Sequence, residues 1–145
     1  ALMERARQRG VEAHVQFLGS RSGIALDEAL TGVHLGVSAL GMHRIAAETS
    51  DIKSREYCAR GLPFVTSNRD HDFAGDFPFA LQIPADDSPL DIGQALSFWE
   101  ALRSDRPGFA TEMRRFAEQR LSWRSKMAPV IEELCAWPSF GAEAA

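Results

Sequence analysis

Residues 48–67 decide how the chain is interpreted, and they read Glu48-Thr-Ser-Asp-Ile-Lys-Ser-Arg-Glu56-Tyr-Cys-Ala-Arg-Gly61-Leu-Pro63-Phe-Val-Thr-Ser67. The stretch predicts a loop, then a helix that stops at Gly61, and then a short apolar strand that Pro63 introduces. This order of loop, helix and strand is typical of an α/β protein with a parallel sheet.

Glu48 and Glu56 are eight positions apart, and eight residues make a little over two helical turns at ~3.6 residues per turn. Acids at that spacing can face one cavity beside the N-terminal end of the helix. That end attracts anions, because its first N–H groups have no partner inside the helix. The stretch therefore predicts a site in which a diphosphate lies on the helix end and the acids bind hydroxyl groups on either side.

This layout resembles the donor-binding half of GT-B glycosyltransferases, especially the retaining group-1 type of family four. Glu48 and Glu56 match the two acids of the family's Glu-x7-Glu motif, and Gly61-Leu-Pro63-Phe-Val matches its Gly-x-Pro tail. Many members also carry Lys-x-x-Glu-Tyr-x-Ala-x-Gly-x-Pro, and this chain reproduces that string at Lys53, Glu56, Tyr57, Ala59, Gly61 and Pro63. The likeness weakens elsewhere but covers most of the chain.

The resemblance implies a role for each matching residue. Glu56 would accept hydrogen bonds from the ribose hydroxyls of a nucleotide-sugar donor, and Glu48, as the catalytic-site acid, would contact the transferred sugar. Carboxylates suit vicinal diols because they offer only acceptors and form short, charge-assisted hydrogen bonds. Lys53 would contact the diphosphate. The further residues that we expect at the donor lie in the loop before the helix: His43, Arg44, Thr49 and Ser50.

The sequence departs from the family between the two acids. Gly-Phe-Gly usually follows the first acid, and here Thr49-Ser50-Asp51 follows it. The carboxylate of Asp51 would repel phosphates at this position. These residues also have a simpler interpretation without a ligand. Glu56 can be a surface residue that pairs with Lys53, and His43 and Arg44 can be ordinary solvent-exposed loop residues.

Composition bounds the class of protein. The chain has 145 residues with 45% hydrophobic and 25% charged residues, which suits one globular domain. Its net charge of −4 argues against a nucleic-acid partner. Cys58 and Cys135 fit no metal spacing and indicate thiols in a reducing compartment. The sequence has no apolar run of transmembrane length. The chain begins in a helical pattern, and we expect it to be a fragment of a longer protein.

Hydrophobic periodicity and turn residues predict alternating helices and strands, hence a parallel sheet with right-handed crossovers. Helices are expected at 2–9, 26–30, 51–60, 89–104, 109–121 and 125–137, and strands at 14–18, 33–39, 64–66 and 79–83. The fold class is therefore α/β: a Rossmann-like three-layer domain with about four parallel strands, spanning 1–145, with a frayed tail over 138–145. We expect 14–18 to pair with 33–38, whose apolar edge must be covered.

Taken together, these features predict most of the C-terminal, donor-binding domain of a bacterial, cytoplasmic glycosyltransferase of glycan or surface polysaccharide synthesis. The donor would be a nucleotide-diphosphate sugar, bound without metal or cofactor. The acceptor, a glycan or lipid-linked group, would bind an N-terminal domain outside this chain, so the fragment alone would be inactive. The resemblance also allows peripheral association of the full-length enzyme with the inner membrane face, and a homodimer of the fragment. Two alternatives stay open: a GT-B-like nucleotide-sugar epimerase, and a non-catalytic α/β interaction module.

Overall fold

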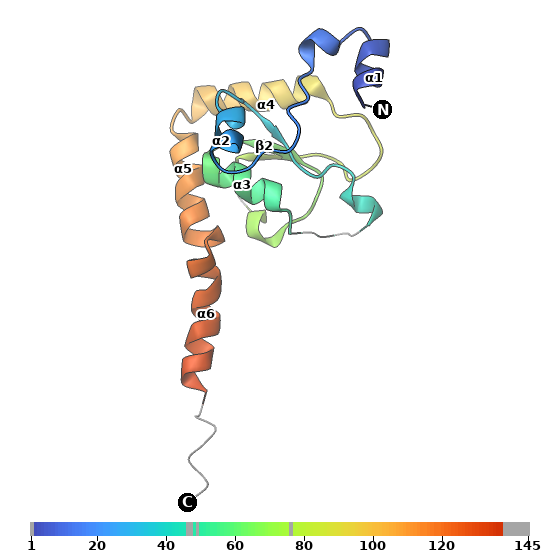
Figure 1. The fold of residues 1–145 in the computed structure, drawn as a ribbon. Coiled ribbons are helices and arrows are strands. Elements are labelled where there is room, and N and C mark those ends of the chain that lie inside the picture. The colour runs from blue at the N-terminus through green and yellow to red at the C-terminus, as the bar shows by residue number, and fades with distance from the viewer. Residues whose placement is uncertain (1, 46–47, 49, 76, 138–145) are drawn as a thin grey trace, which may run out of the picture. The chain divides into compact units, whose positions relative to one another are not determined.

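The computed structural model describes residues 2–45, 48, 50–75 and 77–137, and the chain divides into two compact units, 1–33 and 34–145 (Figure 1). The first unit contains the helix α1 (Leu2–Gln8), the 3-10 turn η1 (Glu12–His14) and the helix α2 (Ile24–Leu30). The expectation of a single domain concerns how the two units associate, and it stays a prediction. The expected frayed tail at 138–145 lies outside the described residues.

The prediction of a strand at 14–18 is wrong. His14 ends η1, and the segment after it joins no strand, leaving Val15, Phe17 and Leu18 between 38% and 49% exposed. An apolar segment becomes a strand only where a neighbour supplies hydrogen-bond partners for its backbone. The expected neighbour was the 33–38 segment, where the carbonyl of Val37 instead accepts a hydrogen bond from the hydroxyl of Tyr57 at 3.4 Å. The predicted ladder between 14–18 and 33–38 is therefore absent as well.

The second unit is built on a small, open, parallel sheet of three strands in the order β1-β2-β3, where about four strands were expected. The strands are β1 (Gly36–Val37), β2 (Phe64–Thr66) and β3 (Ala80–Gln82). Gly36 pairs with Phe64, and Phe64 pairs with Ala80, so all three strands end at the same edge. The prediction of a parallel α/β arrangement is confirmed.

Helix α3 (Ile52–Arg60) connects β1 to β2 and begins and ends where its sequence predicts. Asp51 is its N-cap and accepts the backbone N–H of Lys53 at 3.3 Å. Gly61 follows it in the left-handed conformation with φ of 72°, and the N–H groups of Gly61 and Leu62 bond back to the last helical turn. The local cap residues therefore account for both ends of this helix.

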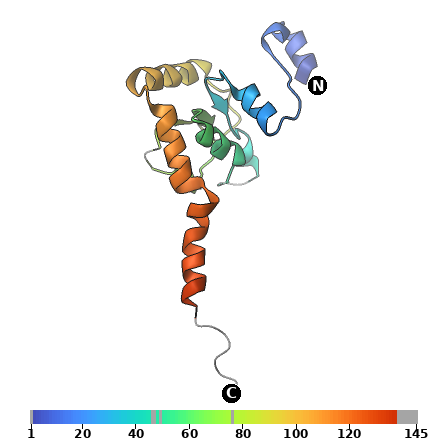
Figure 2. The ribbon, with the colours of Figure 1, turned by 60° about the vertical axis from the view of Figure 1, so that its left-hand side comes forward.

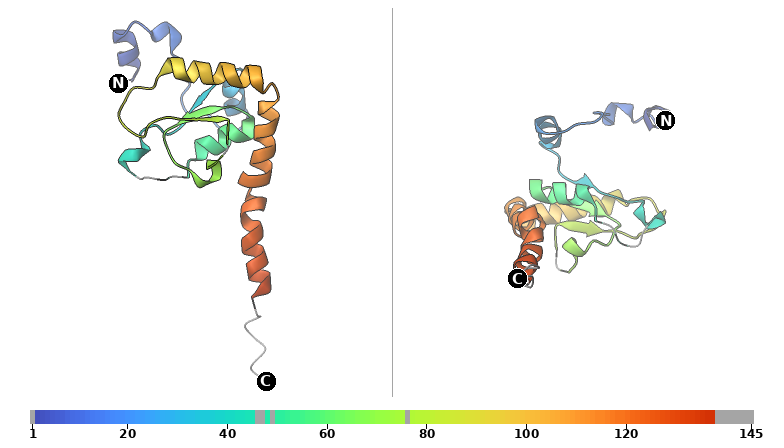
Figure 3. Two further views of the ribbon diagram at one scale, coloured as in Figure 1. Left: turned by 180° about the vertical axis from the view of Figure 1, so that it is seen from behind. Right: turned by 60° about the horizontal axis from the view of Figure 1, so that its bottom comes forward.

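The remaining helices follow the sheet. They are α4 (Ile92–Asp105), α5 (Phe109–Phe116) and α6 (Trp123–Ala136), with 3-10 turns η2 (Met42–Arg44) and η3 (His71–Phe73) in the loops after β1 and β2. Between α5 and α6 lies the π-helical segment η4 (Ala117–Leu121). Figure 2 shows α5 beside α3, against which it packs, and Figure 3 shows η4 and α6 continuing from α5.

The core of the second unit lies where α3, α5 and the sheet meet. The buried members of the cluster are Cys58, Phe64, Phe79, Leu102, Met113 and Ala117. The thiol of Cys58 donates to the carbonyl of Met113 at 3.4 Å, and burial raises its pKa to about 12. Phe73, Phe77 and Phe116 border this cluster, with the rings of Phe77 and Phe116 4.8 Å apart. The aromatic residues of the loop after β2 thus anchor that loop to the core.

Candidate functional site

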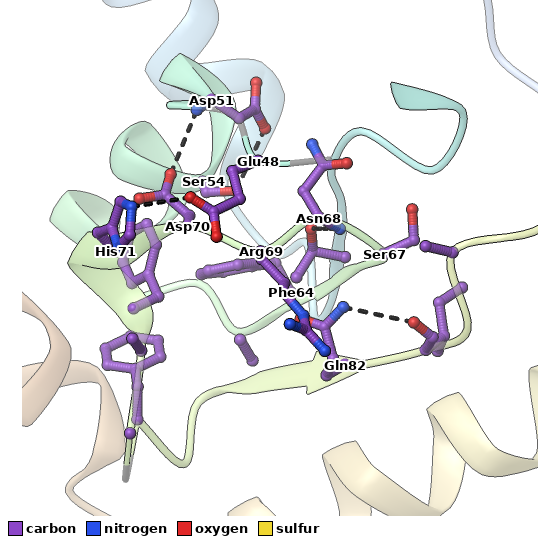
Figure 4. A pocket seen from close by; sticks show the side chains of 18 of the residues that line it. Glu48, Asp51, Ser54, Phe64, Ser67, Asn68, Arg69, Asp70, His71 and Gln82 are labelled. Atoms are coloured by element: carbon purple, nitrogen blue, oxygen red, sulfur yellow. Dashed lines mark hydrogen bonds and ion pairs between the residues drawn. The ribbon is translucent and has the colours of Figure 1, made fainter. Parts of the chain in front are cut away.

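The loops after β1 and β2 meet at the carboxyl edge of the sheet, which is where ligands of open parallel sheets bind. Their backbones form a parallel bridge between Glu48 and Arg69. A pocket of about 630 Å³ opens beside this bridge (Figure 4). Polar residues of both loops line this pocket: Glu48, Asn68, Arg69, Asp70 and His71.

One face of the sheet forms a wall of the pocket. Phe64 and Thr66 of β2 and Ala80 and Gln82 of β3 line it, and residues two apart on a strand share a face. Phe73 and Phe77 add aromatic surface, and the amides of Asn68 and Gln82 add polar groups. The pocket thus combines an apolar wall with a polar rim, a composition typical of small-molecule sites.

Glu48 lies at the rim of this pocket, with 53% of its side chain exposed. Its Oε2 is 2.9 Å from Nε2 of His71. The sequence analysis assigned no role to His71 and did not pair the two residues. Their contact depends on the fold of two separate loops, so the spacing of the residues along the chain contains no sign of it.

The N-terminal end of α3, where we expected a diphosphate, already holds two carboxylates. Asp51 accepts hydrogen bonds from the hydroxyls of Ser38 and Ser54, the latter at 3.2 Å, besides the N–H of Lys53. The N–H of Asp51 itself donates to Asp70 at 3.3 Å. Burial raises the pKa of Asp51, but these hydrogen bonds more than offset it, so the pKa lies below its usual value. A charged carboxylate at this point repels an anion.

Asp70 and Asp72 are held by two cations from other elements. Arg55 on α3 bonds to Asp70 at 2.7 Å and also to Asp72, and Lys126 on α6 bonds to Asp72. Only 21% of the Arg55 side chain and 9% of the Asp70 side chain are exposed. Burial lowers the pKa of Arg55, but the hydrogen bonds that it donates to Asp70 and Asp72 more than offset this effect, so the pKa lies above its usual value. This network fixes the loop after β2 against α3.

Glu56 lies elsewhere. It lines a different pocket, of about 410 Å³, with residues of α3, α5 and η4, among them Arg60, Arg114 and Glu118. In the part of the chain that the structure describes, Glu48 and Glu56 thus line separate pockets, whereas their spacing suggested one shared cavity. The helical repeat of ~3.6 residues applies only within a helix, and Glu48 lies before the first residue of α3.

The other expected donor contacts are spread over the same edge. Nε2 of His43 and Nε of Arg44 lie 3.2 Å and 3.0 Å from Asp87 in the loop after β3. The Arg44 contact lowers the pKa of Asp87. Lys53 and Ser50 are exposed, and Ser50 lines a small hollow with Glu48 and Arg69. Thr49 lies outside the described residues.

Three comparisons, with protein-family models, with curated proteins and with solved structures, found no match to this chain. Within the described ranges, no group of three or more His, Cys, Asp or Glu residues is placed to hold a metal ion. None of the helices in that part of the chain combines the length and apolar character needed to span a membrane.

Proposed function

We propose that this chain is the donor-binding domain of a GT-B glycosyltransferase. The proposed reaction transfers a sugar from a nucleotide-diphosphate donor to a glycan or lipid-linked acceptor in the cytoplasm, with no metal or cofactor required. One observation carries the proposal: the Lys53-x-x-Glu56-Tyr-x-Ala-x-Gly61-x-Pro63 string folds as a helix, a left-handed turn and a strand beside a pocket at the carboxyl edge of a parallel sheet.

In this proposal the two acids have separate roles. Glu48 at the larger pocket binds the sugar, and Glu56 binds the ribose. Because the acids line different pockets in the free chain, each must be tested by itself. The acceptor site and the remaining groups of the reaction are assigned to another part of a longer enzyme, so the property to be measured on this chain is donor binding.

The occupied end of α3 favours a second candidate, a non-catalytic α/β interaction module. Asp51 and Asp70 fill the position at which a diphosphate would bind a helix end. In such a module, Glu48 and Glu56 would be solvated surface acids with no ligand.

Titration of the 145-residue chain with UDP and GDP, followed by NMR, separates the two candidates. The proposal predicts weak binding, on the order of millimolar, with shifts centred on residues 50–57. Glu56→Ala should weaken binding by about tenfold, since it removes a charge-assisted hydrogen bond to the ribose. Glu48→Ala should leave the binding of UDP and GDP unchanged, because neither probe carries the transferred sugar. Glu132→Ala, an exposed change on α6, serves as the matched control. An absence of shifts with both nucleotides, or shifts confined to residues 100–137, would favour the interaction module.

A further inference from the structure

We propose that Arg69 is the residue that binds the diphosphate of the donor, in place of the N-terminal end of α3. The inference rests on the proposed function for the identity of the ligand. It assigns a role to a residue that the family motif does not contain, and it concerns the larger pocket alone.

Arg69 is positioned for this role by its loop. It follows β2, its backbone is bridged to Glu48, and it lines the larger pocket. Figure 4 shows its side chain reaching over the pocket toward Gln82. Across residues 2–45, 48, 50–75 and 77–137, its guanidinium group makes no hydrogen bond, ion pair or ring contact. A solvated guanidinium above a pocket is free to bind an incoming anion.

The other cations near this edge are already engaged or directed elsewhere. Arg55 is held by Asp70 and Asp72, and Lys126 by Asp72. Lys53 is exposed and does not line the pocket. Arg69 is therefore the cation without a carboxylate partner in the described lining of this pocket.

The chemistry of a guanidinium suits a diphosphate. Its planar group offers a fork of N–H donors that matches two phosphate oxygens at once, which an ammonium group does not. The acids of the lining are each satisfied within the chain: Glu48 faces His71, Asp70 faces Arg55, and Asp51 accepts from the end of α3. Each of these acids has partners of its own, and none of them contacts the guanidinium of Arg69, so this group stays open to an anion.

The test uses the 145-residue chain with UDP, uridine and inorganic pyrophosphate as probes. Arg69→Gln should weaken UDP binding by about tenfold or more, abolish pyrophosphate binding, and leave the binding of uridine, which lacks phosphate, unchanged. Arg69→Lys should show an intermediate loss, because it keeps the charge and loses the fork. The control Arg115→Gln removes the same charge from an exposed site on α5 and should behave as the wild type. Thermal melts check that every variant is folded.

The outcomes separate this inference from the proposed function. If Arg69→Gln binds UDP as tightly as the wild type while Glu56→Ala does not, the inference is overturned and the proposed function stands. If the wild type binds pyrophosphate through Arg69 and gains nothing from the nucleoside, the anion site stands and the proposed function fails. If the wild type binds none of the probes, both are overturned.

Discussion

At Gly61 the backbone leaves α3 with φ of 72°, a conformation that L side chains rarely adopt. The same residue lies directly against α5: a Cβ atom built at Gly61 would come within 2.6 Å of the carbonyl oxygen of Ala110. Gly61 therefore ends the helix and also lets the two helices approach closely. The Gly-x-Pro motif thus has a structural reason that is independent of any ligand.

Gly61→Ala should consequently lower the free energy of unfolding by about 2–4 kcal/mol, from the left-handed backbone and the overlap with α5 together. Gly75→Ala is the matched control, because Gly75 has φ of +82° with no atom within 4 Å of an added Cβ. Gly75→Ala should lower the free energy of unfolding by only about 1–2 kcal/mol. Urea denaturation of both variants measures the difference, and equal losses would show that the contact with Ala110 contributes nothing.

At the scale of elements, α3 and α4 offer a comparison of two aspartate caps. Asp91 caps α4 by accepting the N–H of Gln94 at 3.0 Å, in an exposed position. Asp51 caps α3 and also bonds the buried hydroxyls of Ser38 and Ser54. Asp91→Ala should cost about 1 kcal/mol of stability, as for an ordinary cap.

Asp51→Ala should cost more, about 2–3 kcal/mol, since it also removes the carboxylate to which two buried hydroxyls donate. Asp51→Asn keeps an acceptor oxygen for the helix end and should fall between Asp51→Ala and the wild type. Thermal or urea unfolding of the three variants gives the order, and an equal cost for Asp51→Ala and Asp91→Ala would contradict the interpretation.

The elements that could be predicted from the sequence are those whose ends are set by residues nearby in the chain. The bounds of α3 and β2 agree with the prediction because Asp51, Gly61 and Pro63 mark them within a few residues. The segment 14–18 has the composition of a strand, yet pairing is a property of two segments, and its apolar pattern contains no information about a partner. The same limit applies to Glu48 and Glu56, whose spacing was interpreted as helical although one of them lies in a loop.

At the scale of the whole second unit, the network of Arg55, Asp70, Asp72 and Lys126 joins α3, η3 and α6. Arg55→Met should be costly, about 2–4 kcal/mol, because it leaves the nearly buried Asp70 without its cation. Lys126→Met should cost about 1 kcal/mol or less, because 42% of the Lys126 side chain is exposed and water screens its pairing. Chemical denaturation of the two variants tests this order, and a larger loss for Lys126→Met would reverse the assignment.

The same network gives a dependence on pH. Burial raises the pKa of Asp72, but hydrogen bonds from Lys126 and Arg55 more than offset it, so its folded-state pKa lies below the ordinary value of 3.8. The stabilisation is therefore complete above about pH 4, and it is lost as the pH falls through the lowered pKa. Asp72→Asn should flatten this part of the stability profile, which unfolding measurements between pH 2 and pH 5 would show; a profile identical to that of the wild type would exclude Asp72 as its source.

The network also marks the limit of sequence reasoning about the site. Lys126 and Asp72, which contact each other, are 54 positions apart in the sequence. Arg114 and Arg60 are also 54 positions apart, and the side chain of Arg114 on α5 donates a hydrogen bond to the backbone carbonyl of Arg60 on α3. No periodicity or motif connects such residues before the fold is known. The position of the pocket at the carboxyl edge follows from the parallel topology, but the free Arg69 and the Glu48–His71 pair do not.

The burial of Cys58 beneath Met113 has a consequence for the time course of folding. The thiol is covered by a residue 55 positions later in the chain, so the core can close only after α5 has been synthesised and has docked. A segment that contains the sheet and α3 without α5 would leave the thiol of Cys58 without its contact to Met113. Contacts so distant in sequence slow folding, because a long loop must close first. The reactivity of Cys58 therefore reports on this step: during refolding, the moment at which its thiol stops reacting with an alkylating pulse marks the docking of α5.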